Sequence, residues 1–278
     1  MTYKPLTVKI GGSLLQYDIS DIISDVGETL KVYNKILIVH GGANKVDEEM
    51  KKRGLKIKKI YSPSGIESRY TYQMARDVYT EVMEGITTWL VDLLRLQNIG
   101  AYGFPPKEVP INARRKDSII GIWCDDRGQT RRRIIRDDYS GEIKGVDANM
   151  ISRYFDDNSV LVLPPIGNDP IGGSLNINGD KAAAYVAGSI GSEVIVDLTD
   201  VDGVLLKGNI IPRIEYTELG NFIKEVEVRG GMKRKLLHAK ESFEIEGTKV
   251  REFIIANGLK DGPISSALKK ENCTVITK

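Results

Sequence analysis

Five short apolar runs recur along this chain of 278 residues and predict strands that are buried on both faces. They are rich in Val, Ile and Leu and lack the strict apolar–polar alternation of a half-exposed strand. The runs are LTVKI (6–10), KILIVH (35–40), VLVLPPI (160–166), EVIVDLT (193–199) and REFIIA (251–256).

Amphipathic helical patterns separate these runs. Apolar residues recur every three or four positions in segments 18–33, 43–54, 68–97 and 232–247. Strands that alternate with helices predict an α/β fold, a three-layer α/β/α sandwich whose central sheet is mainly parallel. In such sheets ligands bind beyond the carboxyl ends of the strands, so residues that follow each run are the first candidates for function.

One charged segment, residues 113–146, interrupts the alternation. Its short alternating runs flank DDRGQ (125–129), which predicts a turn, so we expect a β-hairpin insertion outside the main sheet. Neither a low-complexity linker nor an internal repeat divides the chain. A soft boundary near 172–174 predicts two lobes, 1–173 and 174–278, on one continuous sheet.

Composition narrows the class of protein. The formal net charge is +2 and 41% of residues are hydrophobic, which suits a globular protein and demands neither nucleic acid nor membrane as a partner. No uncharged apolar stretch reaches membrane length, and the N-terminus lacks an apolar signal region. Cys124 and Cys273 have no metal or redox spacing and are predicted to be reduced thiols of a cytoplasmic protein. With two histidines, histidine-rich metal sites are excluded.

Glycines follow the first two predicted strands. Gly11 and Gly12 come after the first strand, with Lys9 inside it, and Gly41–Gly42 come after the second. Glycine lets backbone N–H groups approach an anion, and the helix that follows adds its positive end. Lys9 precedes its glycines, unlike the lysine of a Walker loop. The alternative is two ordinary tight turns, with His40 a core histidine.

Three further segments carry candidate chemistry. Asp180 lies at a helix start, and Asn176 and Asn178 lie on one side of the segment before it. The alternative interpretation of Asp180 is that it only caps the helix N-terminus. In LTDVDGVLL, Asp200 and Asp202 would meet a nucleotide or its metal, or would only form a turn.

The segment GGMKRKLL places Lys233 and Lys235 in the first turn of a helix. Cations are unfavourable at a positive helix end unless an anion is bound there. Glycine loops, separated lysines and an acidic helix start suit phosphoryl transfer, in which positioning and charge neutralisation provide most of the catalysis.

Six motifs together carry a family resemblance. VKIGGSLL, VHGGANKVDEEM, SRYT, LNINGDKAA, LTDVDGVLL and GGMKRKL stand in the order typical of the amino acid kinase family, which the sequence resembles over nearly its whole length. Within that family it is similar to acetylglutamate kinases. The segments SPSGIESRYT and DYSGEIKGV make it more similar to another group of kinases in lysine and arginine biosynthesis. These kinases phosphorylate aminoadipate or glutamate that is linked to LysW, a small acidic carrier protein.

The resemblance implies a cytoplasmic kinase with ATP and Mg²⁺, in which phosphates, not protein side chains, hold the metal. The lobe 1–173 would bind the acceptor and 174–278 the nucleotide, and the product would be an acyl phosphate. The resemblance also implies a homodimer. The long predicted helix 67–97 agrees with this, because it carries more apolar residues than the core of one subunit would bury.

The resemblance also implies roles for individual residues. Lys9 and Lys235 would neutralise the transferring phosphoryl group, and Asp180 would orient both lysines. The acceptor would contact Gly42, Ala43, Arg69 and Asn176, with Arg69 gripping its α-carboxylate. The nucleotide would contact Gly11, Gly12, Thr199, Asp200, Val201, Gly203, Leu205, Gly231 and Met232.

Ala43 departs from the family, which usually has glycine there. If that position requires positive φ, alanine costs about 1 kcal/mol or more. If it requires only close approach of the backbone, the methyl group narrows the acceptor pocket.

Cations gather in the predicted insertion and favour an acidic carrier over a small free acceptor. The alternatives are a solvated hairpin balanced by nearby aspartates, a kinase of free N-acetylglutamate, and a non-catalytic effector-binding module. Nucleic acid is a weaker interpretation because few aromatics interleave the cations. One methylene separates aminoadipate from glutamate, so the sequence leaves that choice open. The carrier patch comprises Arg114, Arg115, Lys116, Arg131, Arg132 and Arg133.

Overall fold

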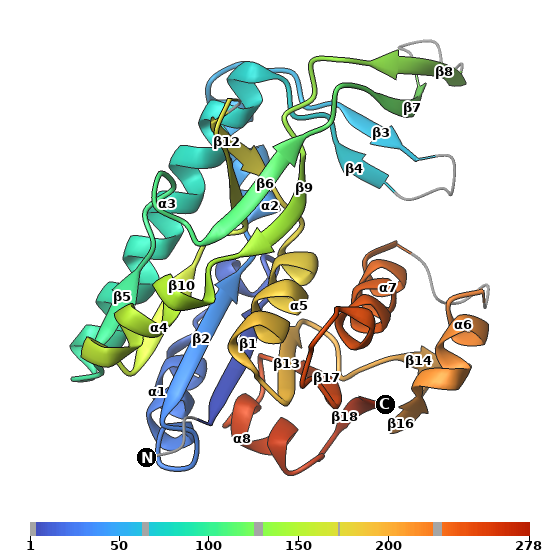
Figure 1. The fold of residues 1–278 in the computed structure, drawn as a ribbon. Coiled ribbons are helices and arrows are strands. Elements are labelled where there is room, and N and C mark those ends of the chain that lie inside the picture. Colours follow the sequence, from blue (N-terminus) through green and yellow to red (C-terminus); the bar gives the residue numbers. More distant parts are fainter. Residues whose placement is uncertain (1–3, 63–66, 125–129, 172, 225–229) are drawn as a thin grey trace.

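An eight-stranded sheet forms the centre of the computed structural model, which describes residues 4–62, 67–124, 130–171, 173–224 and 230–278 (Figure 1). The strand order is β16-β18-β17-β13-β1-β2-β10-β5, and all neighbouring pairs are parallel except β17–β18. The bounds are β1 Pro5–Ile10, β2 Lys35–His40, β5 Ala101–Gly103, β10 Val160–Leu163, β13 Val194–Thr199, β16 Arg213–Glu215, β17 Glu252–Asn257 and β18 Cys273–Thr277.

All five strands predicted from apolar runs lie in this sheet, so the prediction of a mainly parallel α/β fold is confirmed. The run 160–166 is shorter than expected, because β10 ends before Pro164 and Pro165. Proline has no N–H to donate to a ladder, and the chain leaves the central sheet there.

Helices cover both faces of the sheet, which makes the expected three layers. Helices α1, α3 and α8 pack on one face, and α4, α5 and α7 lie on the other (Figure 1). The bounds are α1 Ser20–Thr29, α2 Ala43–Lys52, α3 Gln73–Leu96, α4 Ala148–Asp157, α5 Gly179–Ile190, α6 Leu219–Phe222, α7 Gly230–Glu244 and α8 Pro263–Leu268, with short 3-10 turns at Leu14–Gln16 and Tyr216–Glu218.

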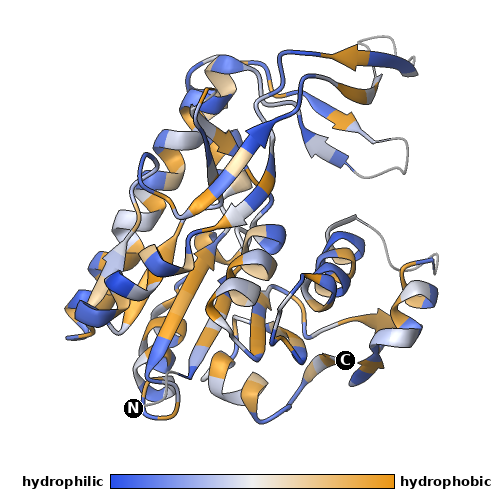
Figure 2. Cartoon of the chain, viewed as in Figure 1, coloured by the Kyte–Doolittle hydropathy of each residue, from blue (hydrophilic) through white to orange (hydrophobic). Residues whose placement is uncertain are grey.

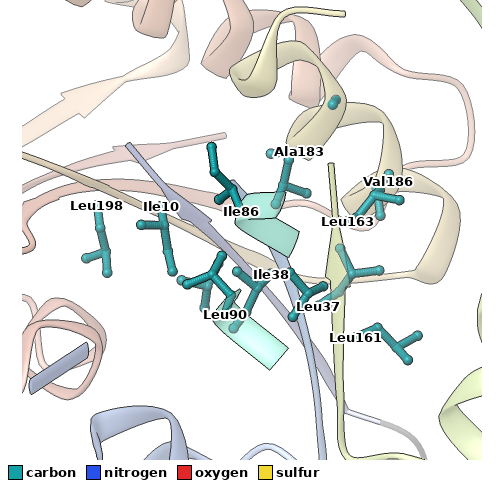
Figure 3. Packing of buried hydrophobic residues seen from close by; sticks show 14 of the residues in the cluster. Ile10, Leu37, Ile38, Ile86, Leu90, Leu161, Leu163, Ala183, Val186 and Leu198 are labelled. Atoms are coloured by element: carbon teal, nitrogen blue, oxygen red, sulfur yellow. The ribbon is translucent and has the colours of Figure 1, made fainter. Parts of the chain in front are cut away.

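The core follows from alternation along the strands. Ile38 meets Ile86 and Leu90 of α3 on one face, while Leu37 lies with Ala183 and Val186 of α5 on the other (Figure 3). Figure 2 shows the central strands as largely hydrophobic. A second hydrophobic cluster lies under α7, and α5 contributes to both clusters. The second cluster includes Ala187, Ile195, Leu236, Phe243 and Phe253.

The predicted helix 68–97 begins too early. Residues Glu67–Arg69 form strand β4, and α3 starts only at Gln73. The intervening Tyr70, Thr71 and Tyr72 favour extended backbone, and the Thr71 N–H donates to Asp138 at 2.9 Å, which holds the segment out of the helix.

The predicted hairpin insertion is confirmed, although it has two tiers. Its base, β6 (Ile111–Arg115) with β9 (Gly141–Val146), joins β11 (Ile166–Asp169) and β12 (Gly173–Asn176) in one sheet. Its tip, β7 (Ile119–Cys124) with β8 (Thr130–Ile135), joins β3 (Lys59–Tyr61) and β4 in another, above α7 in Figure 1. A two-stranded ribbon pairs β14 (Leu205–Leu206) with β15 (Asn209–Ile210). The expected turn at 125–129 and Gly172 lie outside the described residues, and the two lobes stay a prediction.

Candidate active site

Two lysines and two aspartates meet in a buried cluster at the carboxyl edge of the sheet. Lys9 Nζ lies 2.7 Å from Asp180 Oδ1 and 3.2 Å from Asp197 Oδ1. Lys235 Nζ donates to Asp197 Oδ2 at 2.6 Å and to Asp180 Oδ1 at 3.5 Å. None of the four residues is more than 8% exposed, so opposite charges face one another with little water between them.

Each member comes from a different element. Lys9 and Asp197 are register partners on the adjacent strands β1 and β13, so their side chains emerge from the same face. Asp180 is the second residue of α5, and Lys235 comes from α7. The structure thus brings together the three residues predicted to be catalytic, which are 226 positions apart at the extremes (235 − 9).

The structure excludes the alternative role of Asp180 and corrects the predicted position of Lys235 in its helix. Asp180 is not the N-cap of α5, because Asn178 occupies that position and its side chain accepts from the Lys181 N–H at 3.0 Å. Asp180 is therefore free to pair with the lysines. Lys235 lies in the second turn of α7, because the helix starts at Gly230, and the side chain reaches the cluster from there.

Electrostatics keep Lys9 and Asp180 ionised. Burial alone would lower the pKa of Lys9, but the carboxylates of Asp180 and Asp197 raise it well above its usual range. Burial likewise opposes ionisation of Asp180, and Lys235 and Lys9 together hold its pKa well below the usual value. At neutral pH the Lys9 ammonium group is consequently held by the carboxylates of Asp180 and Asp197.

Sequence reasoning missed Asp197. The signal was present, since Asp197 interrupts the apolar residues Val194 to Leu198 of β13. Charged residues are almost never fully buried unless paired, and Asp197 is 0% exposed. An aspartate inside a two-face-buried strand therefore requires cationic partners.

The two glycine loops pack directly on each other. The Gly11 N–H donates to Leu198 O at 2.9 Å, and the Gly41 N–H donates to Ile10 O at 2.8 Å. A Cβ on Gly12 would lie 2.7 Å from Gly42 N, and a Cβ on Gly41 would lie 2.5 Å from Gly12 N. Only glycine at these positions lets the two loop backbones contact each other, and this contact lies beside Lys9.

Replacing Gly12 with alanine is therefore expected to separate the loops. The added methyl group meets backbone, which cannot rotate away, so we expect about 1–3 kcal/mol of destabilisation from overpacking. Urea unfolding measures this effect. Gly85→Ala is the matched control, because a Cβ there meets nothing within 4 Å. Equal stability of the two variants would contradict the proposed contact.

The residues predicted to bind the acceptor lie together on one side of the loops. Arg69 pairs with Asp47 of α2, and its Nη2 donates to Ala43 O at 2.8 Å. Asn176 donates to Thr71 Oγ1 at 2.9 Å. Sequence reasoning missed Asp47, although VHGGANKVDEEM contains it.

Ala43 is the first residue of α2 and is not among the non-glycine residues with positive φ, which excludes the strained alternative. Gly42 N-caps α2 with extended φ, and a Cβ there would lie 2.6 Å from Ile86 Cδ1. His40 is the buried core histidine that we expected. Its Nε2 lies 2.8 Å from Thr87 Oγ1, and burial lowers its pKa to about 4.

The predicted nucleotide residues lie at the ends of β13 and α7. Thr199 ends β13 and is buried, and the exposed Asp200 and Val201 follow it. A Cβ on Gly203 would lie 2.5 Å from Thr274 Oγ1, and Leu205 starts β14. Asp202 accepts a hydrogen bond from the Asn257 side chain at 2.8 Å, in keeping with the alternative interpretation of Asp202 as a turn residue. Gly231 and Met232 lie in the first turn of α7.

The carrier patch is divided between two strands. Arg131, Arg132 and Arg133 are exposed along β8. Arg114 and Lys116 are exposed near the end of β6, but Arg115 stacks 4.0 Å from the centre of the Tyr139 ring and donates to Asp138 O at 3.0 Å. Arg115 therefore also holds the base of the hairpin.

Paired lysines beside glycine loops, at the carboxyl edge of a parallel sheet, define the class of this protein as an α/β phosphotransferase. Comparison with known proteins identifies the family within this class. The profile of the amino acid kinase family matches residues 4–251, and the chain belongs to that family.

Relatives and solved structures agree with this assignment. The chain is 33% identical over 273 residues to a protein of Saccharolobus islandicus named LysW-aminoadipate/LysW-glutamate kinase, covering 98% of this chain and 99% of the relative. A Nitrosopumilus maritimus protein that provisionally bears the same name is 34% identical over 275 residues, covering 98% of each.

The structural neighbours share the fold. N-acetylglutamate synthase of Neisseria gonorrhoeae superposes with a TM-score of 0.79 at 20% identity, covering 100% of this chain and 60% of that chain. Giardia carbamate kinase superposes with a TM-score of 0.65 at 15% identity, covering all of both chains. Through the described part of the chain, no helix combines the length and apolarity that crossing a membrane requires.

Proposed function

We propose that this kinase transfers the γ-phosphoryl group of ATP to the side-chain carboxylate of an acidic amino acid whose amino group is blocked by a LysW-type carrier protein. The products are an acyl phosphate and ADP. The observation that carries the proposal is the cluster of Lys9, Asp180, Asp197 and Lys235 (described above), and the names of the relatives support the acceptor class.

The cluster explains how a carboxylate can be phosphorylated without a catalytic base. A carboxylate is already ionised at neutral pH, so no proton has to be removed before it attacks. The barrier comes from bringing negative groups together and from charge that develops on the phosphoryl oxygens. Lys9 and Lys235 neutralise that charge from β1 and α7, and Asp180 and Asp197 hold both ammonium groups in place beforehand.

Magnesium fits this site through the nucleotide and not through a protein cage. Both cluster aspartates are already paired with lysines, and the described residues contain no group of three or more His, Cys, Asp or Glu able to hold a metal. Mg²⁺ prefers oxygen ligands and often binds through substrate phosphates. The ATP phosphates would therefore bring the ion, which neutralises further charge when bound.

The remaining predicted contacts complete the proposal. The acceptor lies over Gly42, Ala43 and Asn176, and Arg69 grips its α-carboxylate in place of part of its present contact with Asp47. The nucleotide lies in the lobe 174–278, against residues 199–205 and the start of α7. We also propose a cytoplasmic homodimer, with exposed Trp89 and Leu96 of α3 available to a second copy.

An acyl-phosphate assay tests the function directly. Purified enzyme is given ATP and one of three acceptors: carrier-linked aminoadipate, carrier-linked glutamate or free N-acetylglutamate, with hydroxylamine trapping the product. We expect hydroxamate from at least one carrier-linked acceptor and a lower kcat/KM with N-acetylglutamate. Preference for the free acceptor would favour an acetylglutamate kinase, and ATP binding without any acceptor consumption would favour an effector-binding module.

Replacing Arg131, Arg132 and Arg133 with serine should weaken binding of an acidic carrier. These side chains are exposed and steer a partner of opposite charge, so we expect a higher KM for the carrier-linked acceptor and a smaller dependence on salt. The KM for ATP should not change.

The matched control removes the same charge elsewhere, with Lys31, Lys51 and Lys52 replaced by serine; all three are exposed. An equal rise in KM in both triple variants would attribute the effect to net charge and contradict a localised patch.

A further inference from the structure

Three segments that are distant in sequence meet where the hairpin insertion joins the body of the fold (Figure 1). They are residues 69–71 at the end of strand β4, residues 138–140 before strand β9, and Asn176 at the end of strand β12. The Tyr139 N–H donates to Thr71 O at 2.7 Å, and the Asn176 N–H donates to Tyr139 O at 2.9 Å. Backbone hydrogen bonds therefore tie the acceptor side of the site to the base of the hairpin.

The Thr71 hydroxyl connects the two residues that are predicted to hold the acceptor, Arg69 and Asn176. Thr71 is 0% exposed, and its Oγ1 donates to Arg69 O at 3.3 Å and accepts from Asn176 Nδ2 at 2.9 Å. A hydroxyl has one proton, so its use on Arg69 O leaves the oxygen to accept from the amide. The nitrogen end of the Asn176 amide therefore faces Thr71, and the oxygen end is turned away from it.

The Asp138 carboxylate holds the Thr71 backbone in place. Asp138 is 4% exposed; its Oδ2 accepts from the Thr71 N–H at 2.9 Å, and its Oδ1 accepts from the Ser140 N–H at 2.8 Å. Hydrogen bonds from N–H groups to a carboxylate are charge-assisted and roughly twice as strong as neutral ones. Arg115 Nε also donates to Asp138 O at 3.0 Å. Asp138 therefore fixes the backbone of Thr71, while the Thr71 hydroxyl serves Asn176.

We propose that Thr71 and Asp138 are positioning residues for the acceptor amino acid. Thr71 sets the direction of the Asn176 amide, and Asp138 fixes Thr71 beside Arg69. The proposal rests on the proposed function, in which Arg69 and Asn176 bind the acceptor, and deepens it. It also joins two motifs in one role, because SRYT supplies Thr71 and DYSGEIKGV supplies Asp138. Only the amino-acid part of the acceptor is involved, so the effect should be the same for free and carrier-linked acceptors.

Two variants of Thr71 separate the hydroxyl from packing. Valine fills the space but cannot accept from Asn176, whereas serine keeps the hydroxyl and loses a buried methyl group. We expect Thr71→Val to raise KM for the acceptor about five- to tenfold, the scale of one hydrogen bond, while kcat stays near wild type and KM for ATP does not change. Thr71→Ser should keep KM for the acceptor within about twofold of wild type. The reverse order, with serine worse than valine, would make Thr71 a packing residue and overturn the proposal.

Asp138→Asn tests the same network and remains informative if Thr71→Val does not fold. An amide supplies one oxygen to the two N–H groups of Thr71 and Ser140, so one contact is lost, and we expect KM for the acceptor to rise about fivefold. Asp137→Asn is the matched control, because it removes the same charge from the exposed neighbour and keeps an oxygen for the Tyr70 hydroxyl. Equal KM values in the two variants would overturn the proposal.

Thr29→Val controls for the loss of a buried hydroxyl. Thr29 is 3% exposed, and its Oγ1 has no hydrogen-bond partner within the described part of the chain. KM for the acceptor should therefore equal that of wild type. A rise equal to that in Thr71→Val would show a general effect of the substitution and contradict a specific role for Thr71.

A double-mutant cycle shows whether Thr71 acts through Asn176. Asn176→Ala should raise KM for the acceptor, and adding Thr71→Val should then have almost no further effect. Multiplication of the two effects would overturn the proposal. If the wild-type enzyme phosphorylates none of the three acceptors named above, the proposed function itself has failed, and that outcome is visible before any variant is made.

Discussion

Replacing Lys235 with methionine should lower kcat at least about 100-fold, the scale on which removal of one preorganised electrostatic contact acts on the transition state. Lys235 Nζ lies 2.6 Å from Asp197 Oδ2 and is almost fully buried. Methionine keeps much of the side-chain volume and removes the charge, so the loss reports on charge and not on packing. The rate of hydroxamate formation at saturating ATP and acceptor measures it.

The matched control is Lys233→Met, two residues earlier on the same helix. Lys233 is partly exposed and has no place in the buried cluster. Its replacement removes the same charge from α7 and should leave kcat within a few-fold of wild type. Near-normal turnover in Lys235→Met, or an equal loss in Lys233→Met, would contradict the role assigned to Lys235.

The second large effect concerns stability and comes from Asp197. In Asp197→Asn two buried ammonium groups face Asp180 alone, so we expect the free energy of unfolding to fall by about 3–5 kcal/mol, as when one partner of a buried ion pair is removed. Asparagine has nearly the same shape, so no cavity contributes. Urea unfolding gives the value, and Asp200→Asn, at an exposed position past the end of β13, is the control. Equal unfolding free energies would show that the cluster does not stabilise the fold.

The unfolding free energies of these variants should be compared between pH 5 and 9, because Lys9 and Asp180 do not change charge within that range. The pKa of Asp180 is lowered in the folded state, so its stabilisation is complete above its unfolded pKa of about 4 and is lost as pH falls toward the folded value. The pKa of Lys9 is raised, so its stabilisation is complete below about 10.4 and is lost only as pH rises through the folded value. Inside the window both contributions are constant.

Local sequence patterns predicted the central strands and several residues of the candidate active site. Apolar runs located the central strands because burial on both faces leaves few alternatives, and glycines at strand ends located the loops. Lys9, Asp180 and Lys235 were found because each stands beside a glycine turn or a helix start. Asp197 was missed because its meaning depends on register: only the pairing of β1 with β13 places it opposite Lys9.

The errors have the same origin. Segment 67–69 carries a helical pattern, but pairing with β3 makes it a strand, and that pairing is not local in sequence. The cationic character of 114–116 was evident, yet the stacking of Arg115 on Tyr139 depends on how the hairpin folds back. Roles for the acceptor and nucleotide residues stay predictions until the variants are made.

The charged cluster lies between two hydrophobic clusters, and the packing of both affects the distance between its lysines. Lys9 stands on β1 within the first cluster, whereas Lys235 is next to Leu236 of the second, and α5 spans both. A displacement of about 1 Å at reacting groups can cost a hundredfold in rate. The packing of both hydrophobic clusters therefore sets the spacing of Lys9 and Lys235, and a substitution in either cluster is expected to lower the rate although it touches neither lysine.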